Sequence, residues 1–127
     1  MYRVLVTGSR DWDDIETVKF SMVMAESGAH HSGAKGASEI TLVSGACPTG
    51  ADRIAEELAE ELRWGKIERH PANWEKYGKR AGFLRNKEMV DSHPHICLAF
   101  IKNNSKGATM TADLAEKAGL RVVRYRA

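Results

Sequence analysis

The sequence predicts an α/β fold in which helices cover both faces of a mainly parallel, five-stranded sheet. Five apolar, strand-like runs alternate along the chain with stretches that repeat apolar residues at helical spacing. Short loops separate them, which favours right-handed crossovers between parallel strands. Hydrophobic residues make up 43% and charged residues 28% of the 127 residues, as in a globular protein with one core. We therefore expect one domain over residues 1–127.

The first part of the chain is expected to supply a strand, a helix and a second strand. Residues 2–7 form a continuous apolar run, which is typical of a strand buried on both faces. Acidic residues then precede a stripe of helical spacing, which consists of Ile15, Val18, Met22 and Ala25. Residues 27–38 are rich in Gly, Ala, Ser and His and are predicted to be a loop. Residues 40–43 are predicted to form the second strand.

The stretch from Leu42 to Asp52 leads from this strand into the next helix, whose pattern begins at about Thr49. Gly45 and Gly50 permit a turn with positive φ or the close approach of a ligand. Thr49 and Asp52 have the spacing of a capping box. A strand, a glycine-bounded loop and a helix start can bind an anion through backbone N–H groups. The alternative is a well-capped turn without a ligand.

The second half continues the alternation. Residues 66–70 form a short, weaker strand, and the segment that follows it is predicted to be irregular. The remaining predicted elements are a helix over about 79–92, the most apolar strand at 95–101, a turn at 103–107, a helix over about 108–118 that Gly119 closes, and a strand at 120–125.

Three loops are expected to meet at the carboxyl edge of this sheet, where α/β proteins bind ligands. They are residues 8–10, 45–52 and 103–109, and each contains Gly, a hydroxyl or a cation. Their convergence favours a phosphate site. Asn86 falls on an otherwise apolar helix stripe and therefore needs a partner. It either ties its helix to a neighbouring backbone or, with Arg85, reaches a ligand at this edge.

Four segments resemble the YspA-like branch of the SLOG superfamily in order and spacing. They are residues 6–10, 45–52, 85–89 and 105–108, and the match covers nearly the whole chain. The branch includes many short phage and actinobacterial proteins, and the superfamily includes the LOG phosphoribohydrolases and the DNA-processing protein DprA. The resemblance implies a Rossmann-like, three-layer fold that binds a nucleotide or a nucleotide-derived ligand, of the monophosphate, NAD or ADP-ribose type, at the carboxyl edge of the sheet.

The resemblance also implies which residues hold this ligand. They are Gly8, Ser9 and Arg10 in the first loop, Gly45, Thr49, Gly50 and Asp52 in the second, Arg85 and Asn86 on a helix, and Ser105, Lys106 and Gly107 in the last loop. The LOG hallmark PGGxGTxxE, with its glutamate, is absent. Asp52 and Arg85 are the candidate catalytic residues, and Asp11 is a second possible carboxylate. Binding is therefore preferred, with a LOG-like hydrolase as the alternative and single-stranded nucleic-acid binding as a further one.

Net charge, cysteine content and histidine spacing limit which kinds of partner and cofactor we expect. A net charge of +2 without a Lys/Arg block disfavours nucleic acid, and no apolar run is long enough for a bilayer. The chain enters directly into a strand and has only two cysteines, so we expect no signal peptide and a cytoplasmic, reduced location. The histidines lack a metal-binding spacing, and no metal or cofactor is expected.

Two questions stay open at this level. Trp74 and Tyr77 either stack on a nucleobase or cover the end of the sheet as core residues. LOG-like relatives commonly self-associate, so the resemblance implies a possible homodimer through the first or the third helix.

Overall fold

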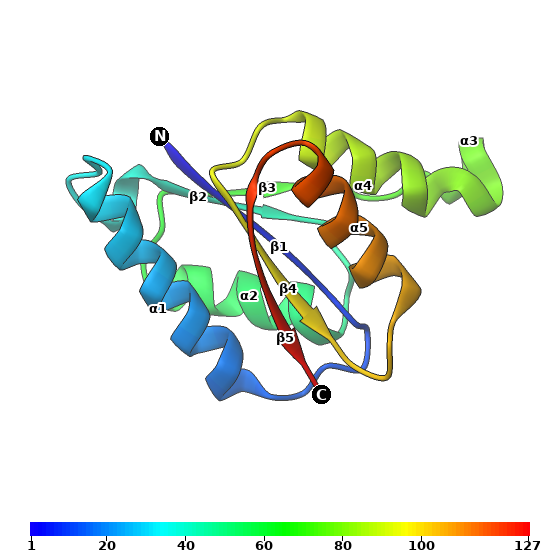
Figure 1. The fold of residues 1–127 in the computed structure, drawn as a ribbon, viewed down its shortest axis with the longest axis horizontal. Coiled ribbons are helices and arrows are strands. Elements are labelled where there is room, and N and C mark those ends of the chain that lie inside the picture. Colours follow the sequence, from blue (N-terminus) through cyan, green and yellow to red (C-terminus); the bar gives the residue numbers. More distant parts are fainter.

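The computed structural model describes residues 1–127 as one sheet of five parallel strands flanked by helices (Figure 1). The strand order is β3-β2-β1-β4-β5. The strands are β1 (Tyr2–Gly8), β2 (Ile40–Ser44), β3 (Lys66–Arg69), β4 (Ile96–Ile101) and β5 (Arg121–Arg126). The α-helices are α1 (Ile15–His31), α2 (Gly50–Glu61), α3 (Trp74–Tyr77), α4 (Ala81–Asp91) and α5 (Lys106–Lys117), and short 3₁₀ turns are η1 (Ala37–Glu39) and η2 (Gly78–Arg80). The predicted Rossmann-like three-layer fold is confirmed.

The two faces of the sheet have separate apolar cores, because side chains alternate along a strand. Val4 and Val6 of β1 pack with residues of α1 and α2. Leu5, between them, packs on the opposite face with Met89 of α4 and Ala115 of α5. All three β1 residues are fully buried, which explains why the first strand reads as continuously apolar.

The switch point of the sheet lies between β1 and β4. The chain proceeds from β1 outward to β2 and β3, then returns to place β4 on the other side of β1 and β5 beyond it. Gly8 at the end of β1 is in register with Phe100 near the end of β4. The loops that follow these two strands diverge to opposite faces, which opens a crevice at the carboxyl edge.

Two predicted loop segments are partly helical. α1 continues to His31, so the predicted loop at 27–38 is wrong over its first residues. Ala29 extends the buried stripe of α1 by one turn and is fully buried, and this packing outweighs the weak helix propensity of the surrounding Gly, Ser and His residues. The segment predicted to be irregular after β3 contains α3, whose start is capped by the Asn73 side chain.

Three smaller expectations are also corrected. Ile15 is exposed and does not join the buried stripe of α1. α5 begins at Lys106, two residues before the predicted start at Ala108. The capping box is wrong, because the Thr49 side chain makes no cap hydrogen bond and Asp52 Oδ2 instead accepts a hydrogen bond from the Cys47 N–H at 3.2 Å.

We predict opposite effects for two glycine substitutions. A Cβ at Gly8 would lie 2.3 Å from Cβ of Ala51 and 2.9 Å from the Phe100 carbonyl oxygen, so Gly8→Ala should lower the free energy of unfolding by about 1–3 kcal/mol or more. A Cβ at Gly28 within α1 meets nothing closer than 4.0 Å, so Gly28→Ala should raise it by about 0.5–1 kcal/mol. Urea unfolding at neutral pH measures both. A Gly8→Ala protein as stable as the wild type would contradict the close packing of α2 on β1.

Candidate functional site

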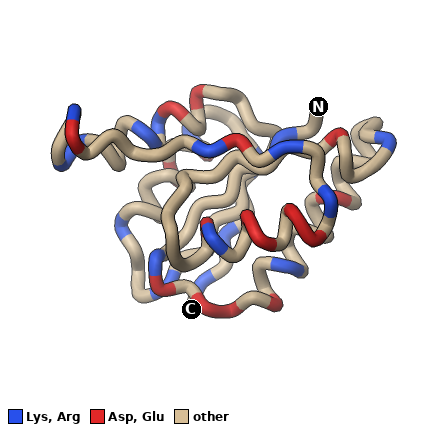
Figure 2. The backbone as a smooth tube through the Cα atoms, turned by 180° about the vertical axis from the view of Figure 1, so that it is seen from behind, with Lys and Arg blue, Asp and Glu red and all other residues tan.

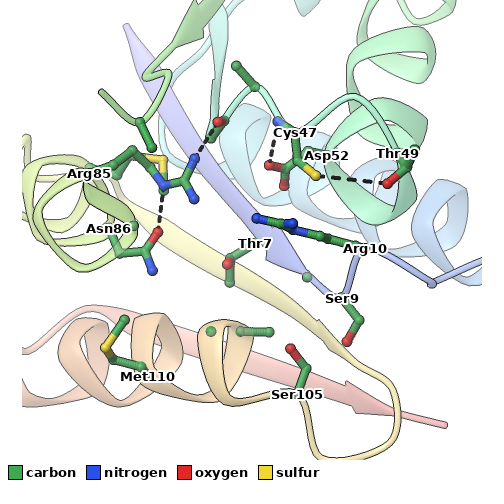
Figure 3. A pocket seen from close by; sticks show the side chains of 18 of the residues that line it. Thr7, Ser9, Arg10, Cys47, Thr49, Asp52, Arg85, Asn86, Ser105 and Met110 are labelled. Atoms are coloured by element: carbon green, nitrogen blue, oxygen red, sulfur yellow. Dashed lines mark hydrogen bonds between the residues drawn. The ribbon is translucent and has the colours of Figure 1, made fainter. Parts of the chain in front are cut away.

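A cavity of ≈ 940 Å³ lies at the carboxyl edge of the sheet, at the switch point (Figure 3). Its walls come from the loops after β1, β2 and β4, the start of α5, and the side of α4 that faces them. The loop after β3 contributes its rim with Pro71 and Ala72. The three loops that the sequence places at this edge therefore meet around one cavity.

All but two of the predicted site residues line this cavity. Those that line it are Gly8, Ser9, Arg10, Gly45, Thr49, Asp52, Arg85, Asn86, Ser105 and Gly107. Gly50 lies behind the wall at φ +71°, where a Cβ would stand 2.2 Å from the Ser9 carbonyl oxygen. Lys106 lies instead in a neighbouring depression on α5, together with Lys117 and Arg126.

Ser9 holds the two loops of the switch point together. Its backbone N–H donates to the Phe100 carbonyl at 2.9 Å, and its Oγ accepts a hydrogen bond from the Lys102 N–H at 2.8 Å. The Ser9 side chain is almost fully buried, and its hydroxyl also donates to the Lys102 carbonyl at 3.3 Å. The hydroxyl already donates and accepts hydrogen bonds within the protein, so the backbone of Ser9 is the part that a ligand can contact.

Arg85 connects α4 to the loop after β2 across the cavity. Its Nη1 donates to the Gly45 carbonyl, and its Nε donates to Asn86 Oδ1 at 2.7 Å (Figure 3). Asn86 therefore orients Arg85 and does not itself bond a neighbouring backbone. A Cβ at Gly45 would lie 2.8 Å from Arg85 Nη1 and 3.0 Å from Asp52 Oδ2, so a larger residue there would displace the ends of these two side chains.

Asp52 is the buried carboxyl of the site. Burial raises its pKa to about 6, and the hydrogen bond from the Cys47 N–H and the nearby charge of Arg85 oppose that rise. Glu56 raises the pKa further, and Arg10 lowers it. A carboxyl with this pKa exchanges its proton near neutral pH, which suits a general acid or base.

Two helices begin at the cavity without a side-chain cap. Thr49 precedes α2 and Ser105 precedes α5, and neither side chain bonds the first turn of its helix. In contrast, Asp14 caps α1 and Asn73 caps α3. The first N–H groups of a helix have no partner within the helix and carry positive partial charge. The Arg10 side chain extends into the same space and makes no hydrogen bond to the protein (Figure 3).

The structure adds cavity residues that sequence reasoning did not assign. Lys102 follows β4 directly and precedes the predicted loop at 103–109, whereas Asn103 is the first residue of that loop but was not assigned to the ligand. Phe83 and Met110 line the cavity from α4 and α5, and nothing in their helical patterns distinguishes them from core residues. The structure contains no group of three His, Cys, Asp or Glu side chains that could hold a metal ion.

A model of the YspA, cpYpsA-related SLOG family matches residues 2–77, which include the loops after β1 and β2. The Gene 61 protein of Mycobacterium phage D29 is 37% identical, over 98% of this chain and 97% of that protein. No solved structure matches the chain.

We predict that Asp52 makes stability depend on pH. Its pKa is about 6 in the folded protein against 3.8 in an unfolded chain, so the folded state binds more protons between these values. Stability should therefore fall by roughly 2–3 kcal/mol as the pH rises from about 4 through about 6. Asp52→Asn removes this loss, so the variant should be more stable than the wild type at pH 7 but not at pH 4.

Urea unfolding of both proteins from pH 4 to pH 8 measures this difference. The Arg3 guanidinium lowers the pKa of Glu68 to about 2, so this ion pair makes the free energy of unfolding rise with pH, mainly below the range in which Asp52 titrates. The effect of Glu68 is the same in the wild type and in Asp52→Asn. A constant stability difference across the range would contradict a raised pKa for Asp52.

Proposed function

This chain belongs to the YspA, cpYpsA-related SLOG family, and on that basis we propose that it binds a nucleotide or nucleotide-derived ligand in the cavity at the carboxyl edge of the sheet. One observation carries the proposal. Two helix starts that lack a side-chain cap and the unpaired guanidinium of Arg10 line the same cavity, although the Ala51 N–H of α2 already donates to the Ser9 carbonyl at 3.3 Å. Phosphate oxygens complement all three, because backbone N–H groups and a guanidinium both donate to anions.

The size of the cavity supports a ligand larger than phosphate alone. Its volume of ≈ 940 Å³ lies within the range of small-molecule and cofactor sites, which is roughly 300–1,000 Å³. Gly107 in the first turn of α5 has open space where a side chain would stand, so a ligand can approach that backbone closely. The phosphate would lie between α2 and α5, and the rest of the ligand would extend toward α4.

The distribution of charge favours this ligand over a polynucleotide. Figure 2 shows Lys and Arg residues interspersed with Asp and Glu along the backbone, without a long stretch of one sign. Tight sequence-independent binding of nucleic acid relies on a concentrated basic surface. No helix combines the length and the apolar character needed to cross a membrane.

A second candidate function is hydrolysis of the bound nucleotide. The observation in its favour is Asp52, a buried carboxyl whose pKa of about 6 allows it to take or give a proton. Cleavage of an N-glycosidic bond needs such a carboxylate to position water or to stabilise an oxocarbenium-like transition state. Water would replace the base at the sugar carbon, which releases the base and a sugar phosphate.

We also propose a homodimer through α1. Phe20, Val23 and Met24 are 60%, 45% and 56% exposed and lie on the helix face opposite the core. Two copies of α1 can pack antiparallel about a two-fold axis that passes between Val23 and Met24. The apolar patch of one copy then contacts the same patch of the other. Glu16 at one end of α1 would then lie near His31 at the other end of the second copy's helix, which gives the pair complementary ends.

The first prediction from this function concerns binding. A nucleoside phosphate at about 100 times its dissociation constant should add about 2.7 kcal/mol to stability, a rise in Tm on the order of 10 °C. Arg10→Ala should weaken that binding by about tenfold or more, because it removes an unpaired cation from the cavity. Lys35→Ala, in the exposed loop at the opposite edge of the sheet, is the charge-matched control. Absence of a shift with any nucleotide would refute the proposal.

The hydrolase candidate is tested by turnover. If the chain is an enzyme, Asp52→Asn should slow release of the base by about 10²-fold or more and leave the dissociation constant within a few-fold. Chromatography of the reaction mixture measures the products. A wild-type protein that binds a nucleotide and leaves it intact would exclude hydrolysis and retain the binding function.

The dimer is tested by light scattering on a sizing column over a range of protein concentrations. Phe20→Glu should weaken association by at least about tenfold, because it places a charge at the centre of the apolar patch. Ile15→Glu, which changes an exposed apolar residue of α1 outside the patch, should leave association unchanged. A wild-type protein that stays monomeric at high concentration would contradict the interface.

A further inference from the structure

The wall of the cavity that α3 and α4 supply differs from the phosphate side. Trp74 of α3 and Phe83 of α4 line it and are 49% and 42% exposed, although they are large and apolar. Pro71, Ala72 and Met110 line the cavity as well. α3 and the start of α4 project beyond the sheet (Figure 1). Trp74 is half exposed and therefore not a core residue, and both side chains form part of the cavity wall.

The Trp74 indole lies close to Gly82, the second residue of α4. A Cβ at Gly82 would lie 3.3 Å from Cη2 of the Trp74 indole, so the ring lies against the backbone of the first turn of α4. Contact with a backbone gives the indole a fixed support on one side. Tyr77, on the same short helix, is 44% exposed but does not line the cavity.

Asn86 supplies a directed polar group beside these rings. The residue is 6% exposed, and it lines the cavity. Arg85 Nε can only donate a hydrogen bond, so the amide atom that faces it at 2.7 Å must be the oxygen. The Nδ2 group of Asn86 is left without a hydrogen-bond partner in the protein. It points away from Arg85 into the cavity (Figure 3). The Nδ2 atom itself is accessible from the cavity, so an acceptor on a ligand can reach this donor.

We propose that this side of the cavity is a nucleobase subsite. Trp74 and Phe83 pack against the base, and Asn86 Nδ2 donates to a ring nitrogen or carbonyl oxygen on its edge. The proposal rests on the nucleotide-binding function and specifies where the ligand's base lies and which groups recognise it. Aromatic rings favour any flat base because every base has a π-face, and the amide donor restricts which edge faces α4.

The subsite predicts that the base of the ligand adds affinity beyond that of its sugar and phosphate. Ribose 5-phosphate has the phosphate and the sugar but no base, and a nucleoside 5′-monophosphate has all three. Stacking on an aromatic side chain strengthens binding of a base by about tenfold or more. The wild-type protein should therefore bind at least one nucleoside monophosphate about tenfold or more tightly than ribose 5-phosphate, as measured by isothermal titration calorimetry.

Two variants locate that preference. Trp74→Ala should reduce the affinity ratio of nucleoside monophosphate to ribose 5-phosphate toward one, and Tyr77→Ala should leave it unchanged as the matched control. Asn86→Asp keeps an oxygen for Arg85 Nε and replaces the cavity donor by an acceptor, so it should lower the same ratio even where the added charge weakens both ligands. Circular dichroism of each variant checks that it is folded.

The outcomes separate the two proposals. Equal wild-type affinity for both ligands would overturn the base subsite and leave phosphate binding intact. A preference for the nucleotide that survives Trp74→Ala and Asn86→Asp would also overturn it, because the base would then lie elsewhere. If neither ligand binds, the proposed function fails and this inference fails with it.

Discussion

The close packing of α2 on the end of β1 determines where the cavity forms. Gly8 has no side chain, so Ala51 of α2 approaches the strand more closely than any larger residue would permit. Gly50 adopts a left-handed conformation and lets the start of the same helix press against the backbone of Ser9. These two contacts hold the N-terminus of α2 at the switch point, and the positive end of a helix therefore stands beside the diverging loops.

The opposite wall depends on a single guanidinium. Arg85 bonds the Gly45 carbonyl from α4, so it joins the helix layer on one face of the sheet to the loop that leads into the layer on the other face. Asn86 fixes the direction of that side chain. Arg85 also favours ionisation of Asp52, although burial has the larger effect on that carboxyl. Arg85 therefore both connects α4 to the loop after β2 and lowers the pKa of Asp52.

The sequence predicts the parts of the structure that depend on local pattern. Val4, Leu5 and Val6 reveal a strand buried on both faces, and glycine-bounded loops after three strands reveal the cavity. Features that depend on tertiary packing are not visible in the same way. Lys106 falls in a predicted phosphate loop, but α5 starts at that residue and turns its side chain out of the cavity.

The same limit applies to the hydrogen bonds of the site. A Thr three residues before an Asp predicts a capping box, but the Asp52 carboxylate accepts a hydrogen bond from the Cys47 N–H instead. The hydrogen-bond partner of the Asn86 side chain is Arg85, the preceding residue. This contact depends on where Arg85 lies against Gly45, which the sequence does not show. Trp74 projects with α3 beyond the sheet, and no periodicity in a four-residue helix could have indicated it.

The two outer strands have a consequence for how copies of this chain meet. β3 is short and reads Lys-Ile-Glu-Arg, and β5 carries arginines at both ends and in its middle. Charged side chains on edge strands oppose the addition of a further strand, because like charges would be brought together and desolvated. The open sheet is thereby protected against growth into a continuous β-structure, even though its edges are unpaired and its helices expose apolar side chains.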